Sequence, residues 1–242
     1  MANALNVRAL SGNALKLLAA AAMLVDHVGA ILLPQVLGLR LIGRLAFPIF
    51  AFMVAQGCKY TRSELRYFLS MFSLGVVCQL VYGATVTADR FNILLTFSAS
   101  ILLIFLLYRV KRALYNRLWS LAAASGLAFL VATAAVYYVN QWMVFDYGFW
   151  GCMTAVFASL FQQRADAPEG WKGADKNILH VAMLAIPLLL LSTYWVQLCA
   201  LAALPLLLCY SGKRGSLPLK YFFYLFYPLH LAVLQGISYL VT

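Results

Sequence analysis

The stretch Leu24-Val25-Asp26-His27-Val28-Gly29 lies inside an apolar run that extends from Leu15 to Leu33. A helix that crosses a bilayer needs about 20 predominantly apolar residues, and this run has that length. An ionised aspartate near the bilayer centre costs roughly 2.5–3.5 kcal/mol on insertion scales. The stretch therefore predicts a membrane span, and it predicts that Asp26 and His27 have partners or a function inside it.

The composition of the whole chain also indicates a membrane protein. Of the 242 residues, 64% are hydrophobic and only 10% are charged. Soluble domains have about 45–50% apolar and about 25% charged residues. The apolar runs are continuous and do not alternate with polar residues, so we expect helices and not the strands of a barrel.

Nine apolar runs are predicted spans. The run 178–210, about 33 residues long, is too long for one span, so we divide it at Ser192-Thr193. The nine predicted spans are 15–33, 41–57, 66–86, 92–109, 118–139, 147–162, 178–193, 195–210 and 219–240. No linker or repeat separates them. We expect an all-α, polytopic membrane helix bundle with one domain over residues 1–242.

The positive charges predict the orientation, because cytoplasmic links carry an excess of Lys and Arg. With the N-terminus inside and the C-terminus outside, nine spans leave only Arg40 and Arg90 in outer links, and Arg44 falls within the second span. The other 15 of the 18 Lys and Arg residues lie on the inner side: Arg8, Lys16, Lys59, Arg62, Arg66, Arg109, Lys111, Arg112, Arg117, Arg164, Lys172, Lys176, Lys213, Arg214 and Lys220. Eight spans would place a basic link on the wrong side.

Several classes of function are not indicated. The net charge of +11 lies in short links, so topology explains it and we expect no nucleic-acid partner. The first apolar run is too long for a signal peptide, and we expect it to be kept. The five cysteines are scattered, and two histidines with one aspartate lack the spacing of a metal site, so we expect no metal. The chain has no glycine-rich phosphate loop, His-Glu-x-x-His or Gly-x-Ser-x-Gly motif.

Arg44 is the predicted partner of Asp26. The two residues lie in antiparallel spans joined by a short link, at similar depth below the outer surface. An ion pair would offset part of the cost of burying each charge. Two alternatives remain open: a pair with a purely structural role, or an Arg44 side chain that reaches the outer headgroups.

His27 and His230 are the two histidines predicted to be buried. His27 projects about 100° away from Asp26 on the helix, so it can face a cavity while Asp26 faces Arg44. His230 lies near the middle of the last span, at a depth comparable to that of His27. We therefore predict that the first and last spans are neighbours and that both imidazoles share a cavity with Asp26. The alternative is an imidazole that only bonds a neighbour. His180, at the inner end of its span, is predicted to be interfacial.

The chain resembles the TraX family of membrane proteins, which N-acetylate conjugative pilin. The resemblance lies in five stretches, in order along nearly the whole chain: Leu15-Lys16 through Asp26-His27, Gly43 through Ala51, Asn92-Ile93-Leu94, Tyr147 through Gly151, and Phe226 through Leu231. It implies a multi-pass protein of the bacterial inner membrane that takes an acyl group from acetyl-CoA. The implied acceptor is a pilin amine, or an amine or hydroxyl of another envelope molecule.

The resulting hypothesis is a membrane-embedded acyltransferase. His27 or His230 would take a proton from the acceptor. Asp26 would orient the site or balance its charge, and Arg44 would stabilise an oxyanion or hold Asp26 in position. Two alternatives stay open. The same residues inside a bundle could form the proton relay of a proton-coupled transporter, although the sequence shows no inverted repeat. A non-catalytic pilus or envelope assembly factor would use them for stability alone.

Overall fold

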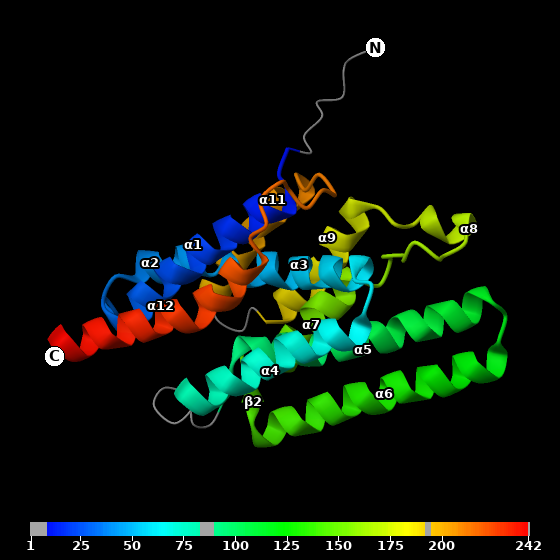
Figure 1. The fold of residues 1–242 in the computed structure, drawn as a ribbon, viewed down its shortest axis with the longest axis horizontal. Coiled ribbons are helices and arrows are strands. Elements are labelled where there is room, and N and C mark those ends of the chain that lie inside the picture. The colour runs from blue at the N-terminus through cyan, green and yellow to red at the C-terminus, as the bar shows by residue number, and fades with distance from the viewer. Residues whose placement is uncertain (1–8, 83–89, 192–194, 242) are drawn as a thin grey trace, which may run out of the picture. The chain divides into compact units, whose positions relative to one another are not determined.

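The structure is a computed structural model that describes residues 9–82, 90–191 and 195–241 (Figure 1). Nearly all of the described chain is helical, which confirms the all-α prediction. The helices are α1 (Gly12–Ile31), α2 (Leu37–Gly43), α3 (Ala46–Tyr60), α4 (Glu64–Tyr82), α5 (Ile93–Tyr115), α6 (Trp119–Trp142), α7 (Gly148–Ala158), α8 (Glu169–Lys172), α9 (Asn177–Leu190), α10 (Trp195–Leu198), η1 (Cys199–Ala203), α11 (Leu204–Leu208) and α12 (Lys220–Val241). Two short strands, β1 (Arg90–Phe91) and β2 (Val144–Phe145), pair in parallel.

Six helical segments among the described residues are long and apolar enough to cross a membrane, which fits a multi-pass membrane protein. They are Gly12–Ile31, Leu37–Tyr60, Glu64–Val81, Ile93–Tyr115, Trp119–Trp142 and Tyr221–Leu240. Three shorter apolar helical segments, Gly148–Ala158, Asn177–Leu190 and Trp195–Leu208, fall where the remaining predicted spans lie. The nine-span count and the orientation stay predictions.

The span predicted over 41–57 is two helices with a break at Arg44-Leu45. Pro48 has no N–H with which to bond the carbonyl of Arg44 four residues earlier, and this missing bond explains why α2 ends here. The span predicted to end at 109 continues as α5 to Tyr115. The division at Ser192-Thr193 lies outside the described residues.

The chain packs into two compact units. The first comprises Met1–Met53 with Ser192–Thr242, and the second comprises Val54–Leu191. In the first unit α1 packs against α2 and α12. Ser11 caps α1 by accepting a hydrogen bond from Ala14 N. The first two N–H groups of α1 bond to a loop far along the chain: Gly12 N donates to Lys213 O and Asn13 N to Arg214 O, each at 2.8 Å.

The second unit is built around α5 and α7. Helices α5 and α6 form a hairpin, α7 packs on α5, and α9 packs on α7 (Figure 1). Asn92 caps α5 by accepting bonds from the backbone N–H groups of Leu94 and Leu95. Helix α7 is buried on every side, whereas α6 exposes large apolar side chains such as Leu127, 64% exposed. An exposed apolar surface of this kind fits contact with lipid.

Candidate active site

Asp26 lies in an ion cluster with two arginines of the first unit. Arg40 Nη1 donates to Asp26 Oδ2 at 2.6 Å and to the backbone oxygen of Asp26 at 3.0 Å. Arg44 Nη2 donates to Asp26 Oδ1 at 3.1 Å. The side chains of Asp26 and Arg44 are 14% and 9% exposed, and that of Arg40 is 31% exposed. Two guanidiniums against one carboxylate give the cluster a net charge of about +1.

Two glycines let α1 and α2 approach closely enough to form this cluster. A Cβ added to Gly43 would collide with the Asp26 side chain, and one added to Gly29 would lie 2.7 Å from Leu39 Cβ. Small residues at such a helix contact bring the backbones together, as is common in membranes. The short helix α2 then holds Arg40 and Arg44, four residues apart, toward the same carboxylate.

The two predicted imidazoles are in direct contact. His27 Nδ1 lies 2.8 Å from His230 Nε2, and the ring centroids are 4.9 Å apart. His230 is buried, and its ring stacks on Phe226 with an interplanar angle of 10°. Tyr227 packs edge-on against the same ring. These contacts fix the His230 ring, while His27 is half-buried.

The hydrogen bonds of this pair determine which nitrogens carry protons when both rings are neutral. His230 Nδ1 lies 2.7 Å from Phe226 O, which can only accept, so Nδ1 of His230 carries the proton. His230 Nε2 is then an acceptor, and His27 Nδ1 must donate to it. His27 Nε2 is left with an unprotonated lone pair, and no described residue hydrogen-bonds to it.

The second unit holds a separate buried polar cluster. Lys59 Nζ donates to Asp175 Oδ2 at 2.6 Å, and His180 Nε2 lies 3.0 Å from Asp175 Oδ1. Burial raises the pKa of the Asp175 carboxyl, but the contacts with His180 and Lys59 outweigh it and hold that pKa below its usual range. His180, predicted to be interfacial, is only 3% exposed and therefore belongs to the interior of this unit.

A family model described as TraX protein matches the chain over residues 11–238. The chain belongs to the TraX family. A curated relative, described as a probable fimbrial assembly protein FimC of serogroup H1 from Dichelobacter nodosus, is 27% identical over 239 residues. The alignment covers 91% of this chain and 92% of the relative. No solved structure matches the chain significantly.

The geometry of this TraX-family protein confirms two predictions made from its sequence. Asp26 pairs with Arg44, and the first and last predicted spans are neighbours, with His27 against His230. The catalytic roles of these four residues, and a cavity shared with Asp26, stay predictions. The sequence predicts Arg40 in an outer link, whereas it lies on α2 and contacts Asp26; its spacing of four residues from Arg44 places both arginines on one helix face.

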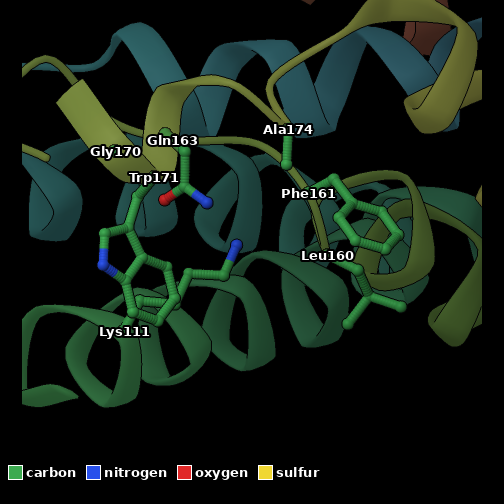
Figure 2. Close-up of a pocket in the computed structure, with 7 residues that line it drawn as sticks. All are labelled: Lys111, Leu160, Phe161, Gln163, Gly170, Trp171 and Ala174. Atoms are coloured by element: carbon green, nitrogen blue, oxygen red, sulfur yellow. The ribbon is translucent and has the colours of Figure 1, made fainter. Parts of the chain in front are cut away.

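A pocket of about 460 Å³ lies in the second unit of the TraX-family chain (Figure 2). It is lined by Lys111, Leu160, Phe161, Gln163, Gly170, Trp171 and Ala174. Sequence reasoning assigned Lys111 to a basic link, whereas it lies inside α5 and is 7% exposed. Among the described residues, no group of three or more His, Cys, Asp and Glu side chains is arranged to hold a metal ion.

Proposed function

We propose that the protein is a membrane-embedded acyltransferase that moves an acetyl group from acetyl-CoA to an amine or hydroxyl acceptor. The observation that carries the proposal is the hydrogen-bonded chain from Phe226 O through His230 to His27. It leaves His27 Nε2 as the nitrogen able to accept a proton. Histidine is suited to this task, because its ordinary pKa lies near neutral pH.

His230 acts in this proposal as a positioning residue. It accepts the proton of His27 Nδ1, and so it fixes the tautomer of His27 and disperses the charge that His27 gains when Nε2 is protonated. An orienting partner behind a general base has the same purpose in the triads of hydrolases. The proposal thus narrows the base to His27, where the sequence left His27 and His230 as equal candidates.

The reaction then proceeds by transfer of one proton and one acyl group. His27 Nε2 takes the proton of the acceptor while the acceptor nitrogen or oxygen forms its bond to the acyl carbon. The bond between carbon and sulfur breaks, and His27 returns the proton to the leaving thiolate. Negative charge develops on the acyl oxygen during this step, and a cluster of net positive charge is suited to stabilise it.

Asp26 and the arginines supply that cluster. The carboxylate of Asp26 holds both guanidiniums in place through the bonds from Arg40 and Arg44. Arg44 is the proposed oxyanion partner because it is the more buried of the two arginines, and low solvent exposure strengthens its electrostatic effect. Arg40 is the proposed second anchor of Asp26.

The acceptor is proposed to be pilin or another envelope molecule, and the location the bacterial inner membrane. Membership of the TraX family and similarity to a relative described as a fimbrial assembly protein support a pilus-related role. The description of that relative also favours a second candidate function, a non-catalytic factor for pilus assembly. In that case the buried polar residues would serve stability alone.

Label transfer in membranes tests the proposal. Membranes with the wild-type protein and pilin should transfer radiolabelled acetyl from acetyl-CoA, whereas His27→Ala should reduce transfer to background. His230→Ala should lower the rate and alter its dependence on pH, because the tautomer of His27 is no longer fixed. His180→Gln serves as the matched control, since it removes the remaining imidazole of the chain from another cluster.

The outcomes separate the two candidates. Normal transfer by His27→Ala, or no transfer by the wild type to pilin or to total envelope extract, would refute the acyltransferase proposal. In the second case, pili that fail to assemble without the protein would favour the assembly factor. Folding is checked separately by thermal melting of each purified variant.

A further inference from the structure

The pocket in the second unit combines an exposed aromatic ring with a buried cation. Its volume of about 460 Å³ lies within the range of small-molecule sites, about 300–1,000 Å³. Figure 2 shows the Lys111 side chain rising from α5 between the Trp171 indole and the side chains of Leu160 and Phe161. The proposed reaction at His27 uses none of these residues.

Trp171 provides the aromatic wall. Its ring is held against Tyr115, with centroids 4.7 Å apart and an interplanar angle of 64°. The Tyr115 hydroxyl is held in turn by donating to Gln163 Oε1. Trp171 is nevertheless 43% exposed, so part of the indole is free for another planar group. Stacking on an aromatic side chain is a common way to bind a nucleic-acid base.

Lys111 provides the cation. No described carboxylate lies within ion-pair distance of it, and Asp175 interacts with it only at longer range. Its Nζ donates to two neutral backbone oxygens, Ser159 O at 2.9 Å and Gln162 O at 2.8 Å. The Tyr108 ring, 5.3 Å from Nζ, adds only a weak attraction. An ammonium has three N–H groups, so one remains beyond these two hydrogen bonds. A buried positive charge without an ion-pair partner favours an anionic ligand.

We propose that this pocket binds the nucleotide end of the coenzyme A thioester, with its base on Trp171 and a phosphate at Lys111. This inference rests on the proposed function for the identity of the ligand. Arg109 lies beside Lys111 on α5 and raises the positive potential of this end of the helix, whereas the charge of Arg112 is offset by Asp166, whose Oδ2 lies 3.6 Å from Arg112 Nε. The positive-inside rule assigns these residues to the cytoplasmic side, from which we expect the thioester to enter.

Binding to the purified full-length protein in detergent tests the inference by calorimetry. The probes are coenzyme A and adenosine 3′,5′-bisphosphate, which carries the base and phosphates without the thiol arm. Trp171→Ala should weaken binding of both at least about tenfold. Ala174→Phe, which fills the pocket and keeps Lys111 and its hydrogen bonds, should weaken binding of both probes further.

Two variants on α6 are the matched controls, because both change exposed residues of the same kind outside the pocket. Trp119→Ala and Ala124→Phe should bind both probes as the wild type does. His27→Ala should also bind them normally, since it affects only the proposed transfer step. We avoid changing Lys111 first, because its loss leaves two backbone oxygens without their donor.

The possible results distinguish this inference from the proposed function. If the wild type binds coenzyme A and Trp171→Ala and Ala174→Phe bind it equally well, the pocket is the wrong site while the acyltransferase proposal survives. If the wild type binds coenzyme A but not adenosine 3′,5′-bisphosphate, the pocket does not hold the nucleotide end and the inference is overturned. Binding that needs Trp171, in a protein without any acyl transfer, would support the nucleotide site and refute the proposed function.

Discussion

Replacing Asp26 by alanine should destabilise the protein more than any other single change in the ion cluster. Asp26→Ala leaves the guanidiniums of Arg40 and Arg44 without their shared carboxylate, and breaking a buried ion pair costs roughly 3–5 kcal/mol. Arg44→Ala should cost less, about 1.5–3 kcal/mol, because Asp26 keeps its bond of 2.6 Å to Arg40. Arg40→Ala should cost the least, since the Arg40 side chain is 31% exposed and water screens its charge.

The double variant Asp26→Ala with Arg44→Ala tests whether the two residues act as a pair. The double change removes both partners, so its cost should fall short of the sum of the single costs by about 1–3 kcal/mol. For a chain of this length each 1 kcal/mol corresponds to about 2–4 °C in melting temperature. The assay is thermal melting of the purified variants in one detergent. Costs that add within about 0.5 kcal/mol would refute the pairing.

Three further predictions follow from the helix contact, the charge distribution and the second polar cluster. Gly43→Ala should lower stability by about 1–3 kcal/mol, because its Cβ collides with a side chain of α1, whereas Gly38→Ala on the same helix meets nothing within 4 Å and should be neutral or stabilising in melting experiments. Alkaline phosphatase fused to the C-terminus should be active in a bacterial host if the nine-span orientation is right, and an inactive fusion would contradict it. Asp175 has a pKa below its usual range, so its stabilising effect is present above about pH 4 and is lost as the pH falls through the lowered value. Asp175→Asn should therefore have a lower melting temperature at neutral pH and lose less stability than the wild type on acidification. An equal loss of stability in both proteins would contradict this assignment.

The sequence predicted those contacts of the site for which the depths of the two residues in the membrane could be compared. Asp26 and Arg44 lie in adjacent antiparallel spans, so their depths could be compared by counting residues, and the same count placed His27 level with His230. Arg40 was missed because the second span was predicted to begin at Leu41. The helix in fact begins at Leu37, and this earlier start brings Arg40 onto the face that contacts Asp26.

Other features could not be predicted because they depend on contacts between distant segments. The burial of His180 follows from the packing of α9 on α7 and from the contact of its neighbour Asp175 with Lys59, 116 residues earlier in the chain. The position of Lys111 follows from two backbone oxygens about 50 residues further along the chain. No local pattern distinguishes such a lysine from one that faces the cytoplasm at the end of a span.

The positions of the two parts of the candidate site along the chain have a consequence for synthesis and membrane insertion. Asp26 and its two arginines lie within 19 consecutive residues, so all three are synthesised early. Each charge therefore has its partner when the first helices enter the bilayer. His27 meets His230 across 203 residues, so this pair cannot form until α12 has been inserted. We therefore expect nascent chains that lack α12 to insert their first helices normally, and the proposed acyl transfer to require that the last helix is in place.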